Sequence, residues 1–410
     1  MIEYDYFVLE NGLRVYVVPD PKVSVAVINI LYDVGSRDET PEKTGFAHLF
    51  EHLMFGGSVN IPSYDEPLQR VGGENNAYTT TDYTNYYLTV PYLNIETGFW
   101  LESDRMLSLS FDPNVLEVQR KVVIEEFRQR YLNRPYGDVM HYLRELVYKD
   151  HPYKWPVIGK DISHIENATM DDVRDFFKTH YLPDRAIMVV GGRVTTEQVK
   201  NLSEKWFAPI PGGNTYQRNY KMESAPLEKK TMLIKKDVPQ DLLLKAWPMG
   251  GRADQDYLAT DLLSDVLGRG NSSRLHEVLV KDKMLCTNIS CSISGSMDPG
   301  LIIVQAYLSD GVTFEQVENE IDEVINNFKI KGISDMELEK VKNQAVVTQR
   351  FGKMDILEKC TQLAYFAALD KPEWLNEETK MIEDIDKDEI AIVAEKYLKE
   401  EKSSVLYYSK

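Results

Sequence analysis

The chain has 410 residues, 43% of them hydrophobic, and a formal net charge of −18 at pH 7. This apolar fraction excludes a disordered chain, and the negative charge argues against a nucleic-acid partner, which would need a basic face. No run of residues reaches the ~18 apolar residues of a membrane-spanning helix, so we also expect no membrane partner.

The cysteines and the first residues bear on the compartment. Three cysteines are too few for a disulfide framework and fit a reducing environment. The acidic start MIEYDYFVLENG does not have the basic and apolar regions of a signal peptide. We therefore expect a cytoplasmic protein, or a periplasmic one if an export signal has been removed upstream.

The first predicted helix lies in the segment GFAHLFEHLMFGG, residues 45–57. Apolar residues surround it on nearly all sides, which predicts that the helix is buried. We expect Thr44 to cap its start and Gly56 and Gly57 to end it.

Three polar side chains interrupt this apolar helix. His48 and His52 lie four residues apart and therefore on one face, where both imidazoles can bind one Zn²⁺. Glu51 lies on the flank of that face, where it can act as general base on a metal-bound water. The alternative is that both histidines are core residues hydrogen-bonded to the backbone. Without such partners their burial would cost on the order of several kcal/mol.

A strand region follows in VGGENNAYTTTDYTNYYLTV, residues 71–90. Thr, Tyr and Asn alternate there after a Gly-Gly turn, which indicates β-structure next in sequence to the helix with the histidines. A strand edge beside a metal can bind an extended peptide through main-chain hydrogen bonds. The alternative is an ordinary strand that binds no ligand.

A second helix, predicted over 110–132, is the best source of a third ligand, which a catalytic zinc site needs beside an open position. Asp112 suits its cap and Pro113 its first position. Glu126 falls near the middle of the predicted inner face, whereas Glu125 falls on the outer flank and is the second choice. Glu126 could instead pair with a basic core neighbour. The inner face is expected to contain Val115, Leu116, Val122, Val123 and Phe127.

The two halves of the sequence resemble each other at three places in the same order. We therefore predict an α+β fold with two homologous domains, each a mostly antiparallel sheet with helices packed on one face. The segment 211–226 is rich in Pro, Gly and polar residues and reads as a linker between domains 1–210 and 227–410. The matching pairs are 25–34 with 241–249, the helical runs that end at Gly56 and Gly268, and 171–192 with 388–408.

These motifs resemble the pitrilysin or insulinase-type metallopeptidases with an inverted zinc motif, family M16. Within that family the sequence is most similar to the short bacterial branch that is like the mitochondrial processing peptidase. The zinc motif is specific, and the resemblance covers essentially the whole chain. The matching stretches are NGLRVYVVPD (11–20), YDVGSRDETPEKTGFAHLFEHLMFGGS (32–58), VGGENNAYTTTDYTNYYLTVP (71–91), QRKVVIEEFRQR (119–130) and LGRGNSSRLHEVL (267–279).

The resemblance implies a duplicated LuxS/MPP-like metallohydrolase fold and zinc-dependent peptide-bond hydrolysis, with one Zn²⁺ per chain. Two sets of residues match functional positions of the family. The metal ligands match His48, His52 and Glu126, and the base matches Glu51. The family's substrate-binding strand matches the region of Asn76, Ala77 and Tyr78, which implies extended oligopeptides or unfolded segments as substrates.

The sequence departs from the family pattern at three places. Gln119 replaces a glutamate that often assists the ligands in relatives. Val280 and Thr287 stand where relatives carry an Arg and a Tyr that steady the tetrahedral intermediate. The second half also lacks the zinc motif, because the matching helix has Thr260, Leu263 and Ser264 at these positions.

These departures imply that the chain holds half of a divided active site. We expect a heterodimer with a homologous subunit that carries the Arg/Tyr pair. The alternatives are a homodimer in which other residues substitute, or an Arg/Tyr pair that lies one or two residues away from the matched positions. A different class of function, a non-catalytic peptide-binding or scaffold subunit, is also open, although such relatives usually lose the zinc ligands.

Overall fold

The computed structural model describes residues 1–213, 216–224 and 226–410 and contains two compact units. Each unit is assembled from three separate segments of the chain. Unit 1 comprises Met1–Arg128, Trp155–Tyr220 and Phe351–Glu377, and unit 2 comprises Gln129–Lys154, Lys221–Arg350 and Glu378–Lys410. The predicted linker 211–226 includes residues 214, 215 and 225, which lie outside the described residues.

Unit 1 is built on a six-stranded sheet with the order β1-β2-β6-β3-β5-β4. Neighbouring strands are antiparallel except β2 and β6, which are parallel. The central strand β3 is almost entirely buried, as expected from its apolar sequence VAVINILY. The strands are β1 (Asp5–Val8), β2 (Arg14–Pro19), β3 (Val25–Tyr32), β4 (Glu74–Thr79), β5 (Thr84–Pro91) and β6 (Ala186–Gly192).

Unit 2 is built on a five-stranded sheet with the order β7-β11-β8-β10-β9. Its strands are β7 (Lys230–Lys235), β8 (Leu242–Pro248), β9 (Cys286–Ile293), β10 (Leu301–Leu308) and β11 (Ser404–Ser409). Only β7 and β11 are parallel. This order and these directions repeat those of β2-β6-β3-β5-β4 in unit 1, strand for strand. Such a repeat is what a duplicated domain produces.

Helices cover the sheets of both units. Those wholly or mainly in unit 1 are α1 (Phe46–Leu53), α2 (Asp65–Arg70), α3 (Ile95–Leu107), α4 (Pro113–Phe127), α6 (Ile162–Glu166), α7 (Met170–His180), α8 (Thr196–Trp206) and α12 (Ile356–Ala368). Those wholly or mainly in unit 2 are α5 (Val139–Val147), α9 (Tyr257–Gly268), α10 (Phe314–Lys331), α11 (Asp335–Gly352) and α14 (Lys387–Tyr397), while α13 (Trp374–Asp384) begins in unit 1 and ends in unit 2.

Short helical turns join these elements. The 3₁₀ turns are η1 (Ser36–Asp38), η2 (Tyr92–Asn94), η4 (Pro152–Lys154), η5 (Pro183–Arg185) and η7 (Glu400–Lys402). Two turns have π geometry, η3 (Arg128–Leu132) and η6 (His276–Asp282). Because η3 continues α4 directly, the helical stretch predicted to extend to residue 132 is present, with wider geometry at its end.

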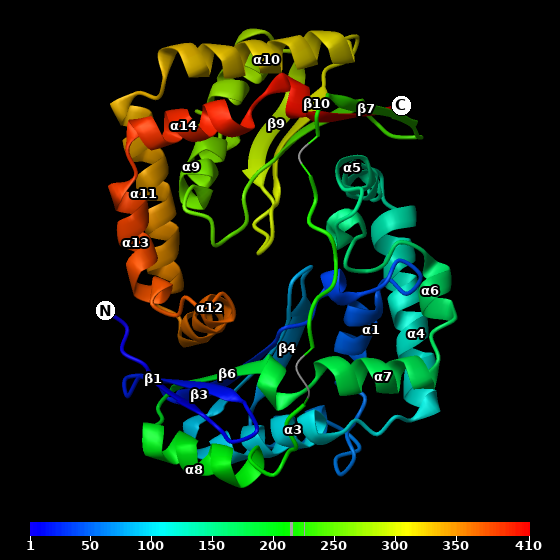
Figure 1. Cartoon of the computed structure of the whole chain (residues 1–410), viewed down its shortest axis with the longest axis vertical. Coiled ribbons are helices and arrows are strands. Elements are labelled where there is room, and N and C mark those ends of the chain that lie inside the picture. Colours follow the sequence, from blue (N-terminus) through cyan, green and yellow to red (C-terminus); the bar gives the residue numbers. More distant parts are fainter. Residues whose placement is uncertain (214–215, 225) are drawn as a thin grey trace. The chain divides into compact units, whose positions relative to one another are not determined.

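Each half of the sequence contributes one helix to the unit dominated by the other half. α12 packs in unit 1 against β3 and β6, where Cys360, Leu363 and Ala367 meet Val27 and Val189 (Figure 1). In unit 2, α5 packs in the same way against β8 and β11. The compact units therefore differ from the sequence segments 1–210 and 227–410, and the division into those two domains remains a prediction.

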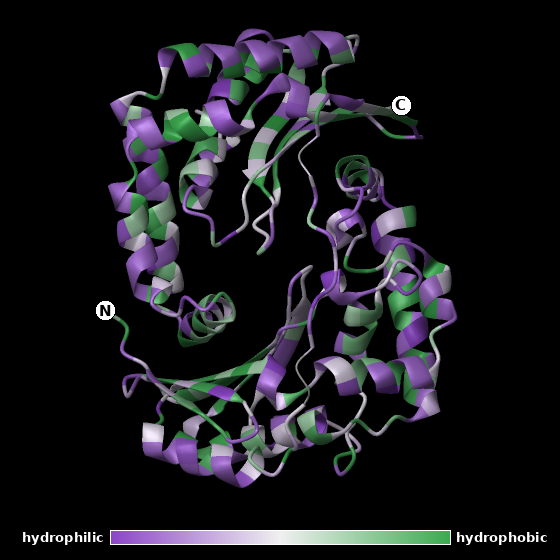
Figure 2. Ribbon diagram, viewed as in Figure 1, coloured by the Kyte–Doolittle hydropathy of each residue, from purple (hydrophilic) through white to green (hydrophobic). Residues whose placement is uncertain are grey.

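The structure confirms the predicted fold class. Both units combine a mostly antiparallel sheet with packed helices. The helices cover both faces of each sheet rather than the predicted single face, because α5 and α12 occupy the second face. Figure 2 shows α10 as mostly hydrophilic on the side in view, as expected for a surface helix, whereas nearly every residue of α9 is buried. Cys286, Cys291 and Cys360 are buried thiols. Across the described part of the chain, no helix combines the length and apolarity needed to span a membrane.

Candidate metal centre

Helix α1 begins at a glycine rather than at the predicted threonine cap. Gly45 is the N-cap residue, with φ of 86°, and a Cβ at this position would lie 2.5 Å from the Ile158 carbonyl oxygen. Only glycine satisfies both conditions. The prediction that Thr44 caps the helix is wrong, because its buried hydroxyl instead accepts a hydrogen bond from the Lys160 amide at 2.8 Å.

The apolar residues of α1 bury the helix as predicted. Phe46, Ala47, Leu49, Phe50 and Leu53 are each 5% exposed or less. The helix ends at Leu53, shortly before the glycines expected to end it. His48 is 8% exposed and His52 is half-buried, so both imidazoles lie at the border of the core.

Helix α4 supplies the carboxylate. Asp112 caps it as predicted, because its side chain accepts a hydrogen bond from the Asn114 amide at 2.8 Å, and Pro113 takes the first position. The predicted inner face is wrong at Val122, which is 45% exposed. Ile124 is buried instead, because the buried face centres on Leu116, Val123 and Phe127, and at 100° per residue Ile124 lies closer to that centre than Val122 does.

The histidines of α1 and a glutamate of α4 converge on one point. The Nε2 atoms of His48 and His52 lie 3.6 and 3.5 Å from the same carboxylate oxygen, Oε2 of Glu126. One ligand atom from each of the three residues lies within 4.8 Å of the others. In the described part of the chain, no other group of three such side chains comes together in this way.

The two distances between a histidine nitrogen and the Glu126 oxygen fit ligands of one tetrahedral metal better than they fit hydrogen bonds. Contacts of 3.5–3.6 Å are too long for good hydrogen bonds between nitrogen and oxygen. Two ligand atoms about 2.0–2.1 Å from one zinc ion would lie roughly 3.3–3.4 Å apart at the tetrahedral angle. Two imidazole nitrogens and one carboxylate oxygen are also a donor set that zinc prefers.

Glu125 does not join this group. Its side chain is 55% exposed and lies 3.7 Å from the Arg128 guanidinium on the outer side of α4. This is the solvated pair that helical geometry predicts for the outer flank. Of the two adjacent glutamates, the structure therefore brings only Glu126 to the histidines.

Glu51 lies beside the convergence point and faces the sheet. Its Oε2 atom accepts a hydrogen bond of 2.5 Å from the Thr79 hydroxyl, at the end of β4. Burial raises the pKa of Glu51 above that of an ordinary carboxyl, and the hydrogen bond from Thr79 opposes this rise. The last residue of β4 therefore orients the Glu51 carboxylate, which lies next to the two histidines.

Strand β4 is the terminal strand of its sheet and pairs only with β5 within that sheet. It contains Asn76, Ala77 and Tyr78, the residues expected to bind substrate. The amide of Ala77 donates a hydrogen bond of 2.9 Å to the side-chain oxygen of Asn76. The edge beside Glu51 therefore has main-chain groups that a further strand could reach.

The residues of the second half that differ from the family pattern make packing contacts and local hydrogen bonds. Val280 packs against the core of unit 2, and Thr287 is exposed on β9, where its hydroxyl lies 3.4 Å from Gln240. In α9, the hydroxyls of Thr260 and Ser264 donate to backbone carbonyls of the same helix. These side chains neither carry positive charge nor offer metal ligands.

Sequence reasoning missed a buried ion pair next to the end of α1. Arg105 is fully buried and forms two hydrogen bonds to Glu102 on the same helix, at 2.7 and 2.8 Å. Its guanidinium also lies over the rings of Phe55, Tyr64 and Tyr86, at 4.5 to 5.4 Å. The spacing of Glu102 and Arg105 by three residues was the available signal, but it is indistinguishable from a surface pair.

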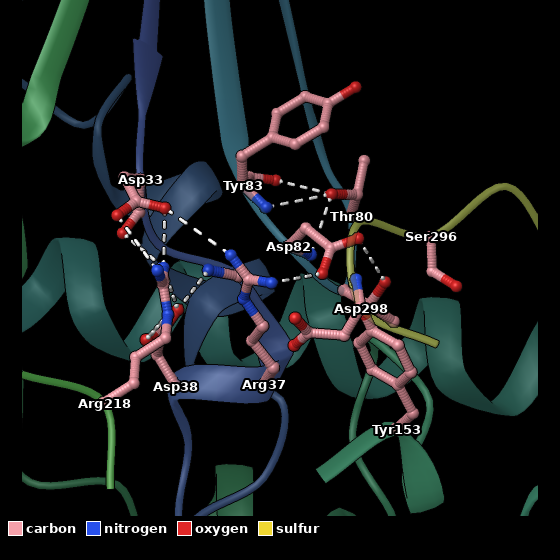
Figure 3. A network of polar contacts seen from close by, with 12 residues as sticks. Asp33, Arg37, Asp38, Thr80, Asp82, Tyr83, Tyr153, Arg218, Ser296 and Asp298 are labelled. Atoms are coloured by element: carbon pink, nitrogen blue, oxygen red, sulfur yellow. Dashed lines mark hydrogen bonds and ion pairs between the residues drawn. The ribbon is translucent and has the colours of Figure 1, made fainter. Parts of the chain in front are cut away.

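A second polar network lies before α1 and was also missed. Arg218 pairs with Asp33 at 2.6 Å and with Asp38 at 2.8 Å, and Arg37 pairs with Asp82 at 2.9 Å (Figure 3). Burial alone would lower the pKa of Arg218. The two neighbouring aspartates raise it by more, so the net shift is upward. The partners are far apart in sequence, so no local pattern could have revealed them.

Two family models match the chain. The model described as "Insulinase (Peptidase family M16)" matches residues 14–161, and "Peptidase M16 inactive domain" matches residues 167–345. The second match covers most of the half that lacks the candidate ligands. Together the two models of one family span most of the sequence.

Named relatives agree with these models. The zinc protease PqqE of Helicobacter pylori is 29% identical over 419 residues, covering 99% of this chain and 92% of that protein. The mitochondrial-processing peptidase subunit beta of Saccharomyces cerevisiae is 30% identical over 206 residues, covering 50% of this chain and 44% of that protein. The crystal structure of a protease from Helicobacter pylori superposes with a TM-score of 0.93 at 27% identity over the whole of both chains. By sequence and by fold, this chain belongs to peptidase family M16.

Proposed function

We propose that this protein is a zinc-dependent endopeptidase that hydrolyses oligopeptides or unfolded peptide segments. The observation that carries the proposal is the convergence of His48, His52 and Glu126 beside the half-buried carboxylate of Glu51. Relatives named as zinc proteases support it.

Three of these side chains would hold the metal. His48 and His52 would bind through Nε2 and Glu126 through a carboxylate oxygen, and three protein ligands leave a fourth position for water or substrate. Bound zinc would supply Lewis-acid chemistry, which polarises a carbonyl group and acidifies water. The helices fix this geometry, because two ligands are on one turn of α1 and the third is on α4.

Glu51 is assigned the proton transfers. Its carboxylate takes a proton from the attacking water as the water oxygen bonds to the peptide carbonyl carbon. The same carboxylate then gives that proton to the leaving nitrogen as the carbon–nitrogen bond breaks. Thr79 orients the carboxylate through Oε2, which leaves the other oxygen for the reaction.

The edge of β4 is assigned to substrate binding. Asn76, Ala77 and Tyr78 lie on the terminal strand, and the following residue, Thr79, contacts Glu51. An extended peptide could pair with this edge through main-chain hydrogen bonds, which place little demand on its sequence. Folded proteins could not present such a strand without unfolding locally.

Removal of the metal is expected to abolish cleavage of a quenched fluorescent peptide library. Dialysis against a chelator should remove the activity, and an equimolar amount of Zn²⁺ should restore it, because the ligands are side chains of a preformed site. Product formation is followed by fluorescence and the cleaved bonds by mass spectrometry. Cleavage that persists in the metal-free protein would refute the proposal.

We also propose that a homologous subunit completes the site. Val280 and Thr287 cannot donate to a developing oxyanion as Arg and Tyr can, and one relative is named as a subunit of a peptidase. We expect the chain to have little activity alone and to gain about 100-fold or more when mixed with a homologue that carries the pair. Full activity of the purified chain alone would exclude this subunit arrangement.

A non-catalytic peptide-binding or scaffold subunit is the second candidate. The match of residues 167–345 to an inactive domain favours it. Peptide binding and cleavage, measured with and without metal, distinguish the two functions. A scaffold subunit would bind peptides equally well with and without metal and would never cleave them, whether or not the homologue is present.

A further inference from the structure

The first turn of α1 carries the first candidate ligand, yet the helix has no side-chain cap of its own. The helix has only eight residues, and His48 is the third of them. Gly45, at the cap position, has no side chain that could accept a hydrogen bond. The first intrahelical bond runs from the Leu49 amide to the Gly45 carbonyl, so the preceding amides need other acceptors.

Glu39 supplies these acceptors from outside the helix. Its Oε2 atom accepts a hydrogen bond from the Gly45 amide at 3.0 Å, and its Oε1 atom accepts one from the Ala47 amide at 2.8 Å. Ala47 directly precedes His48. The Glu39 side chain therefore spans the first turn and accepts hydrogen bonds from two amides that have no acceptor within the helix.

The position of Glu39 is itself fixed by the preceding loop. The ion pairs of Arg37 with Asp82 and of Arg218 with Asp33 and Asp38 hold the residues just before it (Figure 3). In addition, the indole nitrogen of Trp155 donates a hydrogen bond of 2.8 Å to the Ser36 carbonyl. The carboxylate thus reaches α1 from a loop that is anchored at several points.

Burying the carboxyl group of Glu39 costs free energy, because the group loses contact with water. Glu39 is 8% exposed, and burial raises its pKa well above that of an ordinary carboxyl, although the two backbone hydrogen bonds oppose the rise. A buried carboxylate with both oxygens directed at one helical turn indicates a role that an apolar residue could not fill.

We propose that Glu39 is a positioning residue of the metal centre, which holds the first turn of α1 so that His48 keeps its distance from His52 and Glu126. This inference rests on the proposed zinc site. Without the two hydrogen bonds the first turn would fray, and the Nε2 atom of His48 would sample positions away from the other two ligand atoms.

Four variants test the role of Glu39. Glu39→Ala removes both acceptors, whereas Glu39→Gln keeps one. Glu42→Gln makes the same chemical change as Glu39→Gln at an exposed position of the same loop. Arg274→Ala breaks the pair with Glu337, whose hydrogen bonds of 2.7 and 2.9 Å lie in unit 2, and so destabilises the protein without touching α1.

Zinc affinity is measured by competition with a chromophoric chelator, at a temperature where circular dichroism shows every variant folded. We expect Glu39→Ala to weaken binding by about 10- to 100-fold and Glu39→Gln by less. The visible spectrum of the Co²⁺-loaded Glu39→Ala protein should also change, which a purely structural loss would not cause. The Glu42 and Arg274 variants should bind zinc as the wild type does.

Wild-type affinity and an unchanged Co²⁺ spectrum in both Glu39 variants would overturn the positioning role while leaving the zinc site intact. An equal loss of affinity in Arg274→Ala would also overturn it, because general destabilisation would then explain the effect. If the wild-type protein itself binds no zinc, the proposed function fails and this inference fails with it.

Discussion

Replacing Glu51 by Gln is expected to abolish peptide cleavage while zinc stays bound. The amide cannot take a proton from the attacking water, and loss of a general base typically lowers the rate by about 10²- to 10⁴-fold. The proposed metal ligands His48, His52 and Glu126 are untouched, so zinc content should match the wild type. The measurement is kcat on a quenched peptide, in the preparation with the highest activity, with zinc determined on the same sample.

Glu125→Gln is the matched control for this experiment. It makes the same chemical change at an exposed glutamate whose contact with Arg128 lies on the outer side of α4. Its activity should stay close to that of the wild type. Equal cleavage by Glu51→Gln and wild type would remove Glu51 from the reaction.

Replacing Glu126 by Gln is expected to lower zinc affinity far more than replacing Glu125 by Gln. An amide oxygen is a neutral and weaker ligand than a carboxylate, and changes in outer-shell partners alone typically cost about 10- to 100-fold in affinity. We therefore expect a loss of roughly 100-fold or more for Glu126→Gln. Isothermal titration of the metal-free proteins with Zn²⁺ gives both values.

A larger loss of zinc affinity in Glu125→Gln than in Glu126→Gln would assign the third ligand to Glu125. If both substitutions lower zinc affinity only slightly and to the same extent, neither carboxylate binds the metal. Circular dichroism of the metal-free variants provides the control for folding, because both positions lie on the same helix and differ only in the side they face.

Local periodicity was sufficient to predict which side chains converge at the candidate metal centre. The spacing of His48 and His52 places them on one face of any helix, and the angle of 100° per residue separates Glu126 from Glu125. The same logic failed at Val122, because the centre of the buried face of α4 depends on the neighbouring helices and not on the apolar residues of α4 alone.

Contacts between distant residues could not be predicted in the same way. Thr44 has a favourable type for a cap, but the close approach of the Ile158 carbonyl requires glycine at the next position and makes Gly45 the cap residue. The acceptors for the first turn come from Glu39, across a loop. No propensity identifies such a carboxylate before the fold is known.

The repeat in the sequence predicted two related sheets but not the exchange of helices between them. The order of strands in unit 2 follows that in unit 1, as the matching segments implied. α5 and α12 instead bury their apolar faces on the sheet of the opposite half. A helical period shows that such a face exists, but not which sheet it covers.

The most direct test is anomalous scattering from a crystal of the zinc-loaded protein, recorded at the zinc absorption edge. The proposed site predicts one strong peak in unit 1, about 2.0–2.1 Å from Nε2 of His48 and of His52 and at a similar distance from a carboxylate oxygen of Glu126. A zinc peak at other side chains, or none near these three, would contradict the assignment of the metal centre.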